Sequence, residues 1–129
     1  EMISLPKKAI KHYMTTPLIT LQSDDTIADA IQIFSLHHIH GAPVMQGTRL
    51  VGIITMTDII KVIGKEKLLS TRVREIMTSD VVKASSEVQL YEVIRRFKER
   101  GIGRLIVIEN DIPVGILTQS DIIRQFPTL

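Results

Sequence analysis

Residues 52–58 read Gly-Ile-Ile-Thr-Met-Thr-Asp, and residues 115–121 read Gly-Ile-Leu-Thr-Gln-Ser-Asp. The two stretches are 63 residues apart, and the same offset aligns residues 14–63 with residues 77–126 without a gap. Identical residues recur along this alignment, and many other positions exchange one apolar residue for another. The chain is therefore an internal duplication, and the fold of one copy decides the fold of the whole.

Each copy predicts the element order strand, helix, strand, strand, helix. Apolar residues at helical spacing indicate the long helix. They are Ile27, Ala30, Ile31 and Phe34 in the first copy and Leu90, Val93, Ile94 and Phe97 in the second. Thr26 and Asp29 predict a capping box at the start of the first helix. Gly101 predicts a left-handed end of the second helix, and His38 holds the matching place in the first.

Short apolar runs bounded by turn residues predict the strands and hairpins. They lie at residues 18–21, 42–45 and 50–54 in the first copy and at 81–84, 105–108 and 114–117 in the second. A short helix is predicted to close each copy, over about 57–63 and about 120–126. The predicted fold class is α+β, with small mixed sheets packed with helices.

One copy alone buries too little apolar surface to be stable. The two βαββα repeats are therefore expected to pack as a pseudo-twofold pair with a cleft along the axis. The predicted organisation is a helical lead-in at 1–13 (an amphipathic helix over 3–13), a first repeat at 14–63, a linker at 64–76, a second repeat at 77–126 and a tail at 127–129.

The composition excludes several classes of protein. With 44% hydrophobic and 23% charged residues in 129, the chain is not intrinsically disordered. It has no cysteine, which excludes disulfides, thiolate metal sites and cysteine nucleophiles and fits a reducing compartment. No apolar run is long enough to span a bilayer, so the expectation is a cytoplasmic chain without a membrane role.

Charge and aromatic content argue against nucleic acid as a partner. Lys and Arg number 16 against 14 acidic residues, and aromatic residues make up 4%. An enzyme is not expected either, because the repeat supplies no nucleophile–base pair and no poised pair of carboxylates outside the turn quoted above. His37, His38 and His40 gather at a helix end, where the helix dipole accounts for them better than a metal does.

The repeated turn has two compatible interpretations. It brings two hydroxyls and one carboxylate to a helix start, from Thr55, Thr57 and Asp58 in the first copy and from Thr118, Ser120 and Asp121 in the second. Helix capping alone explains these residue types. The alternative is a nucleotide site, in which amides and hydroxyls face phosphate and the carboxylate accepts from the paired hydroxyls of a ribose.

The residues just before each second strand also differ between the copies. Gly103 and Arg104 occupy the positions of His40 and Gly41. Arg104 is either an ordinary surface charge or a clamp for phosphate.

In its repeat, its duplication and its Gly-x-x-Thr-x-x-Asp turn, the chain resembles tandem cystathionine-β-synthase (CBS) domains, the pair called a Bateman module. The openings Met14-Thr15 and Met77-Thr78 and the stretch at residues 40–44 fit the same family. The resemblance covers about residues 14–126. It implies an energy-sensing regulatory module, without a catalytic cofactor, that binds AMP, ADP, ATP or S-adenosylmethionine in the cleft between the repeats.

The resemblance also implies roles for individual residues. Asp58 and Asp121 would take the ribose hydroxyls, and Arg104 would bind phosphate, with His40 nearby in the first copy. Thr55, Thr57, Thr118 and Ser120 would approach ribose or phosphate. Adenine would lie against Thr16, Pro17, Leu18, Ile19, Ile39, His40, Gly41, Ser79, Asp80, Val81, Val82 and Ile102, and Gly103 would belong to the same nucleotide-binding site.

Two departures from the symmetry of the repeats bear on these roles. Gly41 stands where the second copy has Arg104, and Asp80 stands where the first copy has Pro17. An acid at that edge is expected to repel phosphate, so unequal occupancy of the two sites is expected.

Two hypotheses about function remain, and they belong to different classes of protein. The first is a ligand sensor that forms a homodimer and signals by conformational change to an effector protein. The second is a scaffold for dimerisation or partner docking that binds no nucleotide. Under either hypothesis, exposed Ile33, Leu36 and Tyr91 are expected at the interface between copies.

Overall fold

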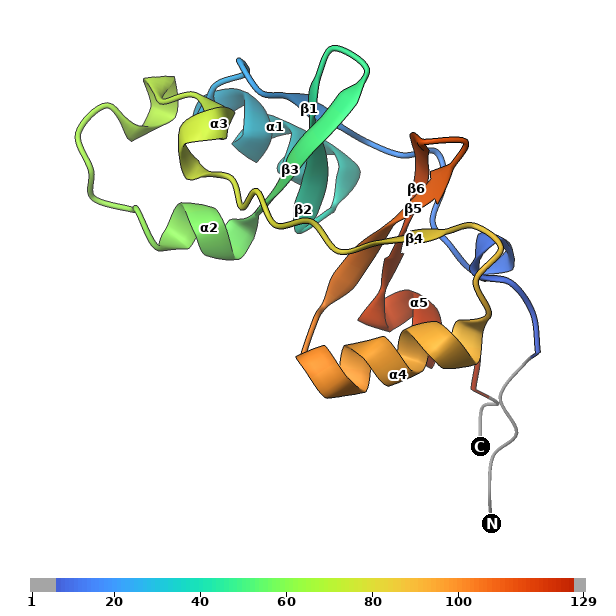
Figure 1. Ribbon diagram of the computed structural model, residues 1–129. Coiled ribbons are helices and arrows are strands. Elements are labelled where there is room, and N and C mark those ends of the chain that lie inside the picture. The colour runs from blue at the N-terminus through green and yellow to red at the C-terminus, as the bar shows by residue number, and fades with distance from the viewer. Residues whose placement is uncertain (1–6, 127–129) are drawn as a thin grey trace. The chain divides into compact units, whose positions relative to one another are not determined.

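The computed structural model describes residues 7–126. These residues form two compact units: Ile19–Val81, called here the central unit, and residues 7–18 with 82–126, called the terminal unit. Each contains a small mixed sheet packed with helices (Figure 1), so the predicted α+β class is confirmed.

The central unit has the strand order β1-β2-β3, with β1 parallel to β2 and β2 antiparallel to β3. Its strands are β1 (Leu21–Gln22), β2 (Gly41–Gln46) and β3 (Arg49–Thr55). Its helices are α1 (Ile27–His37), α2 (Met56–Ile60), the 3₁₀ helix η2 (Leu68–Ser70) and α3 (Val73–Ile76). Leu21, Ile27, Phe34, Val44 and Ile54 form the centre of its core.

The terminal unit repeats this plan with the order β4-β5-β6. Its strands are β4 (Lys83–Ser85), β5 (Arg104–Glu109) and β6 (Ile112–Thr118). Its helices are the 3₁₀ helix η1 (Ile10–His12), α4 (Leu90–Arg100) and α5 (Gln119–Ile123). Ile10, Leu90, Phe97, Leu105 and Leu117 form the centre of its core.

The ends of the long helices follow the predicted local chemistry. The Asp29 N–H donates to Thr26 Oγ1 (3.1 Å), and the Thr26 N–H donates to Asp29 Oδ2 (2.9 Å), which is a capping box. The hydrogen bond from the Thr26 N–H, followed by the interaction with the Thr26 side chain, lowers the pKa of Asp29. His38 (φ 53°) and Gly101 (φ 62°) end α1 and α4 in the left-handed conformation, as predicted.

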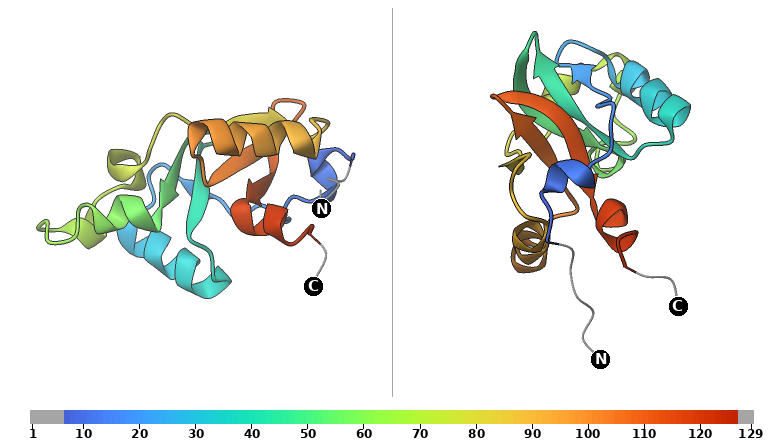
Figure 2. Two further views of the ribbon diagram at one scale, coloured as in Figure 1. Left: turned by 90° about the horizontal axis from the view of Figure 1, so that it is seen from below. Right: turned by 90° about the vertical axis from the view of Figure 1, so that its right-hand side faces the viewer.

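Each sheet pairs with the opening residues of the other sequence repeat. Thr15 pairs with Ile116 of β6, and Thr78 pairs with Ile53 of β3. Thr15, at the start of the first repeat, therefore lies in the terminal unit, which consists mainly of the second repeat. Thr78, at the start of the second repeat, lies in the central unit, which consists mainly of the first repeat. The compact units therefore combine residues of both repeats, as the chain order in colour also shows (Figure 2).

The segments that precede the two openings occupy equivalent places. Ile10 donates its N–H to the Val88 carbonyl (2.8 Å), and Val73, 63 residues later, donates to the Asp25 carbonyl (2.7 Å). The ion pair Lys11–Glu87 (2.7 Å) likewise recurs as Arg74–Asp24. Residues that the sequence assigns to a lead-in and a linker thus perform one structural role.

Several local expectations need correction. The helix expected over 3–13 lies partly outside the described residues, and its described part contains only η1, because residues 8–11 bond instead to residues 86–90. The first strands are shorter than predicted and begin at Leu21 and Lys83. Ile33 is half-buried against the core because it lies three residues after buried Ala30, whereas Ile31 is 42% exposed.

The predicted tail, residues 127–129, lies outside the described residues. Within residues 7–126, no helix has the length and apolar character that crossing a bilayer requires.

Candidate ligand-binding site

The central turn, residues 55–58 between β3 and α2, is held by a network around one carboxylate. The Thr55 N–H donates to Asp58 Oδ2 (2.9 Å), and the Asp58 N–H donates to Thr55 Oγ1 (3.2 Å). Asp58 Oδ1 accepts from the hydroxyl of Thr78 (3.2 Å). The carboxylate thus joins the turn of the first repeat to the opening of the second.

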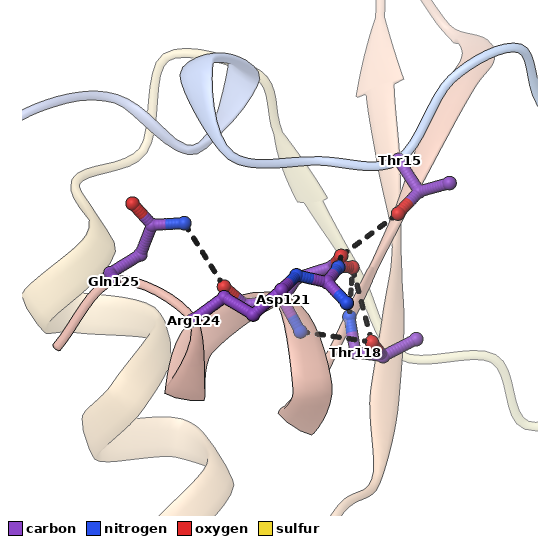
Figure 3. A network of polar contacts seen from close by, with 5 residues as sticks. All are labelled: Thr15, Thr118, Asp121, Arg124 and Gln125. Atoms are coloured by element: carbon purple, nitrogen blue, oxygen red, sulfur yellow. Dashed lines mark hydrogen bonds and ion pairs between the residues drawn. The ribbon is translucent and has the colours of Figure 1, made fainter. Parts of the chain in front are cut away.

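The terminal turn, residues 118–121 between β6 and α5, has the same network with two additional contacts (Figure 3). The Thr118 N–H donates to Asp121 Oδ2 (2.9 Å), and the Thr15 hydroxyl donates to Asp121 Oδ1 (2.9 Å). The Arg124 guanidinium forms an ion pair with that same Oδ1. Gln125 Nε2 donates to the Asp121 carbonyl (3.2 Å).

The two carboxylates differ in exposure. Asp121 is buried, at 2% exposed, and Asp58 is half-buried. Lys61 occupies the place of Arg124 in the first repeat, and none of the ion pairs in the described residues involves Asp58. Asp58 therefore has accessible surface for a ligand in this conformation, whereas Asp121 is buried and its Oδ1 already contacts Arg124 and Thr15.

The amides of each turn are largely occupied by the protein itself. Besides the Asp58 and Asp121 N–H groups, the Met56 N–H donates to the His40 carbonyl (2.9 Å) and the Gln119 N–H donates to the Gly103 carbonyl (3.2 Å). The N-caps are Thr55 and Thr118, and the helices that follow have five residues each. Phosphate recognition by these amides is therefore not supported, and side chains must supply the contacts.

The structure separates the predicted site residues into two sets, each in one unit and each drawn from both repeats. The central set is Ile19, Ile39, His40, Gly41, Thr55, Thr57, Asp58, Ser79, Asp80 and Val81. The terminal set is Thr16, Pro17, Leu18, Val82, Ile102, Gly103, Arg104, Thr118, Ser120 and Asp121. Thr57 and Ser120 are exposed in their turns.

Arg104 belongs to the terminal turn by strand register. It is paired directly with Thr118 across β5 and β6, so the two side chains project from the same face of the sheet. Gly41 is paired with Thr55 in the same way. The central turn thus has no cation at the position that Arg104 holds.

Sequence reasoning does not identify three side chains that contact the two carboxylates: Thr15, Thr78 and Arg124. The repeated Met-Thr openings are a usable signal for the two threonines. Arg124 lies three residues after Asp121, which is a helical ion-pair spacing.

These features define a class of protein: a duplicated α+β module in which two Thr–Asp turns each gather residues from both repeats. The CBS domain family model matches residues 10–65 and 73–127, and the chain belongs to this family as a CBS domain pair. Such a pair is a regulatory module.

Three known proteins illustrate the relationship. The CBS domain pair of protein MJ0100, solved with 5′-methylthioadenosine and S-adenosyl-L-methionine, is 30% identical with a TM-score of 0.82, covering 92% of this chain and 95% of that one. Protein MJ1225 of Methanocaldococcus jannaschii, described as a candidate archaeal homologue of γ-AMPK, is 27% identical with a TM-score of 0.83, covering 92% of this chain and 47% of that one. An inosine-5′-monophosphate dehydrogenase of the same organism is 33% identical over 84% of this chain, which spans 21% of its length.

Proposed function

We propose that the chain is a sensor of adenosine-containing ligands, namely AMP, ADP, ATP or S-adenosylmethionine. The observation that carries this proposal is the placement of Asp58 and Asp121, each held by a Thr–Asp capping network and a threonine from the opposite repeat. A carboxylate in this position suits the paired hydroxyls of a ribose. The adenosine ligands in the related MJ0100 pair support the same ligand class.

The signal would arise from the joining of the two repeats at each turn. A ligand that contacts both the Thr–Asp turn of one repeat and the Met-Thr start of the other repeat binds most tightly to the conformation in which these two segments are in contact. Ligand binding would therefore stabilise one arrangement of the openings, and an effector protein would read the changed surface. The ligand would lie between residues of the two sequence repeats and within one structural unit.

The first experiment is a thermal-shift series with AMP, ADP, ATP and S-adenosylmethionine. A ligand at a hundred times its dissociation constant adds about 2.7 kcal/mol to stability, which is readily detected. Asp58→Ala and Asp121→Ala are each expected to weaken binding at the altered turn about tenfold or more, because a charge-assisted hydrogen bond to ribose is lost. Isothermal titration calorimetry measures this loss.

Glu66→Ala is the matched control, because Glu66 is an exposed carboxylate outside both turns. It should leave all affinities unchanged. Wild-type affinity in the Asp58→Ala, Asp121→Ala double variant would contradict the assignment of these residues. An absence of any shift across the panel would contradict the sensor itself and favour the nucleotide-free scaffold.

One observation favours self-association in addition. In the central unit, Ile31, Phe34, Ser35, Met56, Ile59 and Ile60 line an open apolar groove of about 300 Å³. Ile60 of this groove is 65% exposed, and Leu36 (68% exposed) extends the apolar face along α1. An apolar face is complementary to itself, as a symmetric dimer requires. We propose that a second copy of the chain covers it.

Leu36→Asp and Ile60→Asp are expected to convert a dimer into a monomer, because each places a charge in the apolar contact. Analytical ultracentrifugation measures the mass. Ile112→Asp is the control, since Ile112 is also exposed (59%) but lies in the hairpin of the terminal unit. A dimer that survives both α1 and α2 variants would overturn this proposal.

A further inference from the structure

We propose that the exposed face of α4, in the terminal unit, is a docking surface for an acidic segment of a partner protein. This surface, called here the α4 face, is an open groove of about 320 Å³ lined by Tyr91, Ile94, Arg95, Lys98 and Glu99. The proposal concerns neither Thr–Asp turn, and it depends neither on ligand binding nor on self-association.

The α4 face differs from the matching face of α1, although the buried sides of the two helices agree. The buried residues of both helices are apolar and lie 63 positions apart. At the exposed positions, α4 has Arg95 and Lys98 where α1 has Gln32 and Ser35. Packing in the core is the same in both helices, so it does not explain the charge of the α4 face.

The terminal unit has an excess of positive charge that the central unit lacks. Its described residues include ten Lys and Arg against six Asp and Glu, whereas the central unit has six against seven. Lys7 and Lys8 are exposed beside the start of α4, because the Lys8 carbonyl accepts the Leu90 N–H (3.0 Å). A positive potential over this unit attracts an acidic partner and raises its association rate.

Ion pairs on α4 itself use only a part of its positive charge. Glu92 pairs with Arg95 and Arg96. Among the described residues, Lys98 and Arg100 form no ion pair. The Arg95 side chain is 61% exposed, and an exposed ion pair of this kind contributes little to stability. Arg95 and Lys98 are therefore available to carboxylates of a partner.

Tyr91 gives the α4 face an apolar anchor point. It is 55% exposed and lines the groove together with half-buried Ile94. Tyrosine and arginine are enriched among the residues that contribute most to protein–protein binding. An apolar side chain seated in this groove would exclude water from the neighbouring ion pairs and so strengthen them. The partner segment is therefore expected to carry an apolar residue flanked by carboxylates.

Other classes of partner fit this surface less well. Glu92 and Glu99 interrupt the positive charge of α4 and would repel a phosphate backbone or an anionic membrane. The apolar side of α4 is buried in the core at Val93 and Phe97, so it is not available for insertion into a bilayer. A second copy would bring the same excess of cations against the surface. Tyr91 is thereby assigned to an acidic protein and not to the interface between copies that the sequence suggests.

A fluorescently labelled acidic peptide with one central leucine is the probe, and fluorescence anisotropy measures its affinity. The Arg95→Gln, Lys98→Gln double variant is expected to bind the peptide at least about tenfold more weakly than wild type. Lys65→Gln, Lys67→Gln is the matched control, because it removes two exposed cations from the central unit. The control should bind within about twofold of wild type, since distant surface charges are screened by salt.

Tyr91→Ser tests the apolar anchor separately. It should weaken binding of the leucine peptide and leave unchanged the binding of the same peptide with serine in place of leucine. Thermal unfolding checks that each variant folds.

Four results would overturn the proposal. They are no binding of the acidic peptide to wild type, equal losses in the two double variants, tighter binding of wild type to phosphatidylserine vesicles or a single-stranded oligonucleotide than to the peptide, and a change of sedimenting mass upon Tyr91→Ser. The second would show non-specific charge attraction, the third a membrane or nucleic acid as the partner, and the fourth a second copy on the α4 face. None of them bears on the proposed adenosine sensor.

Discussion

Gly52→Ala is expected to destabilise the central unit by about 1–3 kcal/mol, the usual cost of overpacking a well-packed site. A Cβ at Gly52 would lie 2.6 Å from Met77 Sδ and 2.9 Å from the Thr78 carbonyl oxygen. The methionine is able to shift its flexible side chain. The carbonyl is less free to move, because it accepts the Ile53 N–H at 2.9 Å in the pair that joins the opening to β3.

Denaturant unfolding followed by circular dichroism measures this cost, and the repeat supplies a matched comparison. A Cβ at Gly115 would lie 2.6 Å from Met14 Sδ but 3.2 Å from the Thr15 carbonyl, so Gly115→Ala should cost less. Gly103→Ala is the control, because a Cβ at Gly103 would meet no atom within 4 Å, and its stability should stay within about 0.5 kcal/mol of wild type. Equal stability of Gly52→Ala and wild type would show that the Thr78 opening does not pack on β3.

The elements that sequence reasoning predicts correctly are those that local chemistry determines. The Thr26–Asp29 capping box and the left-handed Gly101 each depend on residues within a few positions. The hairpins depend on apolar runs and an adjacent turn, and they are present as β2–β3 and β5–β6. A repeated pattern strengthens each of these signals, because both copies must satisfy it.

The exchange of segments between the repeats is not predictable in the same way. Residues 8–13 and 71–76 occupy equivalent places, but their similarity reduces to Ile10 with Val73 and Lys11 with Arg74. Their structural role depends on contacts with residues far along the chain, such as the Val88 carbonyl. The sequence of such a short amphipathic segment does not predict which part of the chain it pairs with or in which register.

In the candidate site, too, the features determined by local sequence are predictable and those determined by side-chain arrangement are not. The turn residues Asp58 and Asp121 are identifiable because their capping role is local and repeated. Their different surroundings are not: Arg124 forms an ion pair with buried Asp121, whereas half-buried Asp58 has no ion pair among the described residues although Lys61 holds the place of Arg124. An exchange of one cation for another is conservative in sequence, yet here only the arginine forms an ion pair with the carboxylate of its turn.

Ile10→Ala is expected to destabilise the terminal unit by about 2–5 kcal/mol, the range for emptying a large buried aliphatic site. Ile10 is fully buried in the core cluster that includes Leu90 and Leu117. Ile10 lies before the first repeat, which begins at residue 14 in the alignment of the two copies. If residues 1–13 were only a lead-in outside the core, the substitution would have little effect on stability. Its large cost would show that the segment is a part of the terminal unit.

Hydrogen exchange with mass spectrometry identifies the unit that is affected. Ile10→Ala should accelerate exchange in residues 82–126, and the matched variant Val73→Ala should accelerate it in residues 19–63 at a smaller cost of about 1.5–3 kcal/mol, because valine buries less surface. Leu69→Ala is the control, since Leu69 is 59% exposed. Faster exchange in residues 19–63 upon Ile10→Ala, with residues 82–126 unchanged, would contradict the exchange of segments, because it would place Ile10 in the core of its own repeat.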